Sequence, residues 1–258
     1  MALLPVTKSL TDKVAIVSAS AQGIGFAIAK RLGLDGASIV VTDGNRQQVE
    51  HAAATLMLDG IRVSGVAAQV GKEEGRRKLI DFAIEKYGKL DILVSNAAVN
   101  PNVGDTLTIS NQQWVNLVQL KMNEALELSK VAIPHIESSG RGSIVFVSST
   151  ADFAPIKDVG AYSVMKSALT GLNNTLSQRI AGKSIRVNAV APGLISTDFS
   201  KLLYSDVFGH QNWLQQIPIQ RYGMTEECAG AVSFLVSDEA CYMTGETIGI
   251  NGGMQAQI

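Results

Sequence analysis

The feature that most constrains the fold is a regular alternation of short runs rich in β-branched residues with longer segments of helical spacing. Such alternation predicts parallel strands joined by right-handed helical crossovers. The predicted strands are Val14–Val17, Ile39–Val41, Val63–Ala67, Ile92–Val94, Ile144–Val147, Val187–Val190 and Ile248–Ile250. The predicted helices are Ile24–Leu34, Arg46–Leu58, Glu73–Tyr87, Asn111–Ile136, Ala161–Ile180 and Glu226–Val236.

The apolar runs show little period-2 alternation, which is typical of strands buried on both faces. They therefore predict an α/β fold, a doubly wound Rossmann-type sheet of seven parallel strands with helices on both faces. The sequence contains no linker, charge block, low-complexity tract or internal repeat. Since 258 residues are within the range that one α/β domain fills, residues 1–258 are expected to form a single domain.

The charge balance argues against large anionic partners. The chain has 22 Lys and Arg against 23 Asp and Glu, so it carries no strong positive field for nucleic acid or an anionic membrane. Apolar runs are too short for a membrane helix, and a soluble cytoplasmic protein is expected. Cys228 and Cys241 form neither a CxxC nor a Cys/His cluster, which predicts two reduced core thiols and no metal site.

A small-residue turn follows the first predicted strand. Val17 leads into Ser18-Ala19-Ser20-Ala21-Gln22-Gly23-Ile24-Gly25 and then into a helix, the context of a dinucleotide-binding turn. Small side chains let the backbone approach a pyrophosphate, and the helix N-terminus offers unpaired N–H groups and the positive end of its dipole. The alternative is an ordinary turn between a strand and a helix.

Asp43 ends the second predicted strand, 18 residues after Gly25. That offset is close to the roughly 20 residues expected of an acid that binds the ribose hydroxyls of a dinucleotide. Its carboxylate would repel the 2′-phosphate of NADP, so NAD(H) is favoured, although Arg46 lies close enough in sequence to oppose this effect. The alternative role for Asp43 is to cap the following helix.

Tyr162 and Lys166 lie four residues apart on one face of a predicted helix. An ammonium group beside a phenol stabilises phenolate and is expected to draw the phenol's pKa from about 10 toward neutrality. Ser149 follows the strand Ile144–Val147, at the edge where open α/β sheets bind ligands. The sequence thus predicts a proton-transfer site, with a surface Tyr/Lys pair as the alternative.

With Ser95-Asn96-Ala97-Ala98 and Pro192-Gly193-x-x-x-Thr197, these motifs resemble the short-chain dehydrogenase/reductase family from Lys13 to Gly253. The resemblance implies that Ser149 positions a substrate carbonyl, Tyr162 transfers a proton, and Lys166 lowers its pKa and binds the nicotinamide ribose. The implied cofactor-binding residues are Ser18, Ala19, Ser20, Gln22, Gly23, Ile24, Gly25, Asp43, Asn96, Ala97, Ala98, Tyr162, Lys166, Pro192, Gly193, Ile195 and Thr197.

Within the family, Ser95–Pro101, Ala191–Ile195 and Cys228–Gly230 are similar to a branch of tetrameric, largely peroxisomal reductases. That branch reduces aromatic ketones, α-dicarbonyls and retinal with NADPH, which implies a homotetramer and keeps NADP(H) as the alternative cofactor. The branch's serine and arginine for the 2′-phosphate are replaced by Asp43 and Gly44. The sequence ends in Gln-Ala-Gln-Ile, so a peroxisomal address is not supported.

Two further departures bear on activity. Ala19 stands at the family's first motif glycine, where alanine is tolerated if φ is negative. Lys121 interrupts the apolar face of Asn111–Ile136 at the position of the family's relay asparagine, which implies a role in proton relay beside Lys166. The alternative is a lysine whose ammonium reaches solvent.

The segment Gly193–Ile217 is rich in large apolar residues and is implied to be a substrate lid, with a subunit contact as the alternative. The expected activity is NAD(P)-dependent hydride transfer between nicotinamide and an apolar ketone, aldehyde or secondary alcohol, as in a carbonyl reductase or alcohol dehydrogenase. The alternative function is a catalytically weakened protein of the same fold that binds a cofactor or a partner.

Overall fold

The computed structural model describes residues 9–96, 106–118, 122–154, 160–197 and 213–254. Its strands form one parallel sheet in the order β3-β2-β1-β4-β5-β6-β7. All seven predicted strands are confirmed, some with one to four further residues. Their bounds are β1 Val14–Val17, β2 Ser38–Asp43, β3 Val63–Ala67, β4 Ile92–Ser95, β5 Gly142–Val147, β6 Ile185–Pro192 and β7 Thr247–Ile250.

The helices also follow the predicted segments. Over the expected helix Asn111–Ile136 the structure describes two segments, separated by residues 119–121, which lie outside its described part, and by a π-type turn at residues 122–123. The α-helices are α1 Gly23–Leu34, α2 Arg46–Leu58, α3 Glu73–Tyr87, α4 Asn111–Val118, α5 Glu124–Ser138, α6 Gly160–Ile180 and α8 Thr225–Val236. Short 3₁₀ turns include η3 Thr150–Asp152 and η7 Asp238–Ala240.

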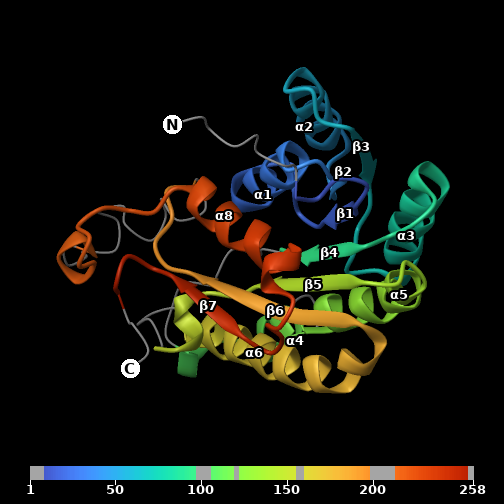
Figure 1. Ribbon diagram of the computed structural model, residues 1–258. Helices are drawn as coiled ribbons and strands as arrows, with labels where there is room; N and C mark the ends of the chain where they lie inside the picture. Colours follow the sequence, from blue (N-terminus) through green and yellow to red (C-terminus); the bar gives the residue numbers. More distant parts are fainter. Residues whose placement is uncertain (1–8, 97–105, 119–121, 155–159, 198–212, 255–258) are drawn as a thin grey trace, which may run out of the picture.

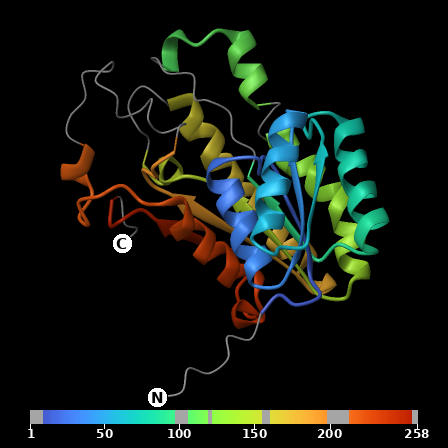
Figure 2. The ribbon, with the colours of Figure 1, turned by 90° about the horizontal axis from the view of Figure 1, so that it is seen from above.

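The sheet is covered on both faces, which explains its nearly continuous apolar strands. One core joins the sheet to α1, α2 and α8, and a second joins its other face to α3, α5 and α6. In the ribbon, α1 and α8 run side by side on the face opposite α5 and α6 (Figure 1, Figure 2). The predicted doubly wound α/β architecture is therefore confirmed.

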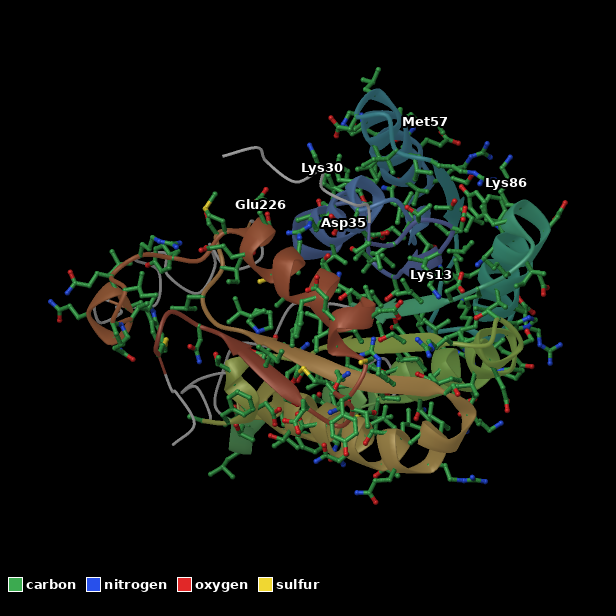
Figure 3. All side chains as sticks on the ribbon, viewed as in Figure 1. Lys13, Lys30, Asp35, Met57, Lys86 and Glu226 are labelled. Atoms are coloured by element: carbon green, nitrogen blue, oxygen red, sulfur yellow. The ribbon has the colours of Figure 1, made fainter. Side chains whose placement is uncertain are left out.

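Asp35 links the two neighbouring helices α1 and α8. It follows the last residue of α1 and accepts hydrogen bonds from Arg31 Nε, at 2.8 Å, and from the Ser233 hydroxyl of α8. Figure 3 shows Asp35 between these helices. The contact holds the far end of α1, whereas the N-terminus of α1 begins just after β1 at the carboxyl edge of the sheet. That edge, where β1 pairs with β2 on one side and β4 on the other, is the switch point of a doubly wound fold.

The two cysteines differ in environment. Cys228 is buried within α8, as predicted, but Cys241 is exposed just after η7, so its assignment to the core was wrong. No helix in the described part of the chain is long and apolar enough to cross a bilayer. Across the same residues, no group of three or more His, Cys, Asp and Glu side chains is placed to hold a metal ion.

Candidate active site

Side-chain hydroxyls and an amide build the turn after β1. Ser20 Oγ donates to the carbonyl of Val17 at 2.6 Å and accepts from the backbone N–H of Thr42 at 3.0 Å. Ser18 Oγ accepts from the backbone N–H of Asn96 at 2.9 Å. The turn is thus fixed to the ends of β2 and β4, and the sequence prediction correctly brought Ser18, Ser20 and Asn96 to one place.

The backbone of this turn is compact and strained. Ala19 has a φ of +47° and Gly23 a φ of +61°. A Cβ atom on Gly25 would lie 2.4 Å from the Ala19 carbonyl oxygen and 2.5 Å from Asn96 Nδ2, so only glycine fits there. Ala19 therefore does not meet the negative-φ condition under which alanine is tolerated.

The N-terminus of α1 has the features of an anion site. Gln22 precedes the helix in an extended conformation, no side chain caps the helix, and its first turn contains no acidic residue. A phosphate close to this end meets N–H donors and the positive end of the helix dipole. Together with the close approach that Gly25 permits, these features fit a dinucleotide pyrophosphate.

Asp43 occupies the end of β2 beside this turn. Its Oδ1 accepts from the backbone N–H of Gly44 at 2.7 Å. The capping alternative is wrong, because Asn45 caps α2 by accepting from the N–H of Gln48. Arg46 does not neutralise Asp43, since its Nε bonds Glu50 at 2.7 Å and its side chain is 83% exposed. Arg46 therefore forms no ion pair with Asp43.

Ser149, Tyr162 and Lys166 come together at the carboxyl end of β5. Ser149 begins the η3 turn by accepting from the Ala151 N–H at 3.2 Å, and its side chain hydrogen-bonds Tyr162. Lys166 is 5% exposed and donates from Nζ to the carbonyl oxygen of Val147 at 2.7 Å. Its Nζ lies 5.5 Å from the centroid of the Tyr162 ring. The predicted triad is therefore assembled.

Burial sets the protonation states of this triad. Loss of solvent raises the pKa of Tyr162 to about 12, although the hydrogen bond with Ser149 opposes the rise. Burial lowers the pKa of Lys166 to about 8, and the Asp152 carboxylate opposes that fall. The expected shift of the Tyr162 pKa toward neutrality is therefore wrong for this structure, because desolvation of the buried phenol outweighs the lowering effect of the Ser149 hydrogen bond.

The segment after β6 closes the same edge of the sheet. Gly193 donates its N–H to the Ile250 carbonyl at 2.9 Å, and a Cβ there would lie 2.9 Å from the Cα of Asn251. Ile195 is buried and forms an isolated parallel β-bridge with Gly223. Four other predicted residues lie in the described part of the chain: Gln22 precedes α1, Ile24 is in its first turn, Pro192 ends β6 and Thr197 follows β6.

Several predicted residues lie outside the described part of the chain. They are Ala97, Ala98 and Lys121, with residues 198–212 of the expected lid. Sequence reasoning missed Asp152, which lies three residues after Ser149 and acts electrostatically on Lys166. The sequence carries only a weak signal for Asp152, because a single acidic residue in a turn belongs to no motif and to no periodic pattern.

Comparisons with known proteins agree with this geometry. A family model described as enoyl-(acyl carrier protein) reductase matches residues 18–255. Dehydrogenase/reductase SDR family member 4 of Oryctolagus cuniculus is 44% identical over 249 residues, covering 96% of each chain. The human protein of that name is 43% identical, covering 96% of this chain and 90% of the relative. These relatives confirm the branch resemblance.

A solved structure gives an independent comparison. It is the 3-ketoacyl-(acyl-carrier-protein) reductase of Brucella melitensis, complexed with NADH, and it matches with a TM-score of 0.88 at 25% sequence identity. The match covers 96% of this chain and 100% of the other. The fold around the candidate site is therefore similar to that of a protein observed with a nicotinamide cofactor.

Proposed function

Because this chain belongs to the short-chain dehydrogenase/reductase family, we propose that it is a carbonyl reductase or alcohol dehydrogenase that acts on an apolar ketone, aldehyde or secondary alcohol. The coarser activity, an NAD(P)-dependent oxidoreductase, follows from the family and from the NADH-bound neighbour. The observation that carries the finer proposal is the Ser149, Tyr162 and Lys166 cluster at the carboxyl edge of β5.

A nicotinamide cofactor, when bound, supplies or accepts the hydride. The residues that would hold it are the turn Ser18–Gly25, Asp43 for the ribose, Asn96 as a brace for the turn, and Pro192–Thr197 beyond β6. The compact cradle at Gly25 and the uncapped α1 N-terminus support this assignment. The Asp43 carboxylate supports NAD(H) over NADP(H), because it would repel a 2′-phosphate and because Arg46, the nearby cation, is paired with Glu50.

The protein's own side chains supply a proton and orient the substrate carbonyl. The Tyr162 phenol, with a pKa of about 12, is protonated at neutral pH and donates from Oη to the oxygen of a carbonyl being reduced. Ser149 holds that oxygen by a hydrogen bond and already contacts Tyr162. The Lys166 ammonium, fixed by the Val147 carbonyl, stabilises negative charge that develops on the phenol oxygen.

Further parts of the proposal rest on the family resemblance. They are a homotetramer, an apolar lid within 193–217 and a proton-relay role for Lys121. A competing proposal is that two substitutions, Ala19 with its strained backbone and Lys121 at the relay position, have lowered the turnover rate. The protein would then bind a cofactor or a partner without efficient catalysis. The assembled triad favours the enzyme, because a binding protein has no need of a serine, tyrosine and lysine in this arrangement.

The direct test follows NADH and NADPH absorbance separately with aromatic ketones, dicarbonyls, retinal and secondary alcohols. Tyr162→Phe removes one hydroxyl and should lower kcat by about 10²- to 10⁴-fold while NADH binding changes little. Val164→Ala, on an exposed position of the same helix, is the matched control and should keep its activity. Retention of more than about a tenth of kcat by Tyr162→Phe would overturn the role of Tyr162. NADH binding without turnover of any substrate in the panel would favour the binding protein.

A further inference from the structure

Asp152 contacts α6 just after Lys166. Its backbone carbonyl accepts a hydrogen bond from Ser167 Oγ at 3.2 Å, and its carboxylate accepts one from the Thr170 hydroxyl. Thr170 follows Lys166 by four residues and therefore lies on the same face of the helix, and Ser167 is the next residue along the chain. The η3 turn that begins at Ser149 thus presents a carboxylate to the helix of Tyr162 and Lys166.

Few charged groups act on this lysine. Among the described residues, the titratable groups set against Lys166 are Tyr162 from its own helix and Asp152 from η3, while β5 contributes the neutral carbonyl of Val147. Tyr162 is uncharged as a phenol, so the Asp152 carboxylate supplies the opposing negative charge. In the buried setting of Lys166, one such charge has a larger effect than at the surface.

We propose that Asp152 is a positioning residue for the reaction, whose carboxylate, held by Thr170, keeps the Lys166 ammonium charged beside Tyr162. This inference rests on the proposed function, because a charged Lys166 matters when Tyr162 transfers a proton. The carboxylate also disfavours phenolate, so it helps to keep Tyr162 in the protonated form required for reduction. Asp152 is not assigned any contact with substrate or cofactor.

Removal of the Asp152 carboxylate is expected to move the pKa values of Lys166 and Tyr162 in the same direction. The Asp152 carboxylate raises the pKa of Lys166 against the lowering effect of burial. Its removal therefore lowers the pKa of Lys166 below about 8, and the loss of a nearby negative charge also favours ionisation of Tyr162. Each loss of a proton from the pair then occurs at lower pH than in the wild type.

The test separates charge from hydrogen bonding. Asp152→Asn removes the charge but keeps an oxygen that accepts from Thr170, whereas Thr170→Val removes that hydrogen bond and keeps the charge. The alkaline limb of kcat/KM for reduction should move to lower pH by about half a unit or more in Asp152→Asn, as expected for one nearby charge. The limb should move less in Thr170→Val, which keeps the carboxylate charge but removes one of its hydrogen bonds, and Asp152→Glu should keep the limb closer to its wild-type position than Asp152→Asn does.

A readout without turnover keeps this inference distinct from the proposed function. The side-chain ¹³Cε shift of Lys166, in protein labelled at lysine and assigned with Lys166→Arg, is followed from pH 6 to 10. A lower titration midpoint in Asp152→Asn than in the wild type supports the proposal even if no substrate is reduced. An unchanged midpoint, or an equal shift in Thr170→Val, overturns it, while a lack of activity in the wild type counts against the proposed function alone.

Discussion

The side-chain amide of Asn96 donates to the backbone carbonyl of Ala19 at 3.1 Å, and the same amide nitrogen lies 3.3 Å from the Ser18 carbonyl. The end of β4 therefore braces the turn that follows β1. Ala19 adopts a left-handed conformation there, and such a conformation persists in a non-glycine residue when its surroundings hold it in place. Asn96 supplies part of that restraint beside the candidate pyrophosphate site.

Asn96→Ala should loosen this turn. Loss of the amide leaves the Ser18 and Ala19 carbonyls without these donors and should lower the free energy of unfolding by about 1–3 kcal/mol. NADH affinity should fall about tenfold or more, because the turn no longer holds one conformation. Urea denaturation measures the first effect, and NADH fluorescence titration measures the second.

Asn188→Ala is the matched control for that variant. Asn188 is fully buried and its amide donates to the Met243 carbonyl at 2.9 Å, away from the turn after β1. Its loss should reduce stability but leave NADH affinity unchanged. If both variants weaken NADH binding equally, general destabilisation explains the result and Asn96 has no special role in the turn.

Ala19→Gly should relieve strain. A left-handed alanine costs roughly 1–2 kcal/mol, which glycine would relieve. Glycine also makes the unfolded chain more flexible, and this offsets part of the gain in stability. The net effect should be a gain of about 0.5–1 kcal/mol in the free energy of unfolding, measured from the urea midpoint at constant m-value. A lower midpoint would show that the Ala19 methyl group contributes packing that outweighs the strain.

Asp43→Ser with Gly44→Arg should reverse the cofactor preference. A Cβ at position 44 meets no atom within 4 Å, so the arginine can be accommodated. Removal of the carboxylate and addition of a cation should favour NADPH over NADH by roughly 5- to 150-fold, the equivalent of 1–3 kcal/mol. Calorimetric titration of both cofactors decides the outcome. Tighter NADPH binding by the wild type would contradict the assignment of Asp43, and Arg46→Ala then tests whether Arg46 is the cause.

The strands and the site motifs could be read from the sequence because their signals are local. Val14–Val17 and Val63–Ala67 are short β-branched runs, and the structure gives them the predicted bounds. The position of Ser149 after β5 follows from the rule that parallel strands present their carboxyl ends at one edge. These inferences required no knowledge of which side chains touch.

Contacts between distant segments could not be read in this way. The pKa of Tyr162 depends on how much solvent the packed α6 and η3 exclude, and a tyrosine and lysine at helical spacing carry no information about that burial. The hydrogen bond from Thr170 to Asp152 joins residues 18 positions apart through a turn with no periodic signature. The positive φ of Ala19 likewise arises from the brace by Asn96, which is 77 residues away.

The pH dependence of carbonyl reduction should report the charge on Lys166. Under the proposed mechanism, reduction requires a protonated Tyr162 and a charged Lys166, and with pKa values of about 12 and about 8 both forms predominate below pH 8. As pH rises through about 8, Lys166 loses its proton, so kcat/KM should be level from pH 6 to 7.5 and then fall. Lys166→Arg keeps a positive charge at this site throughout that range, so its profile should lack the limb near pH 8 even if its absolute rate is lower. A wild-type reduction rate that rises between pH 7 and 9, or a limb that persists in Lys166→Arg, would assign the titration to another group.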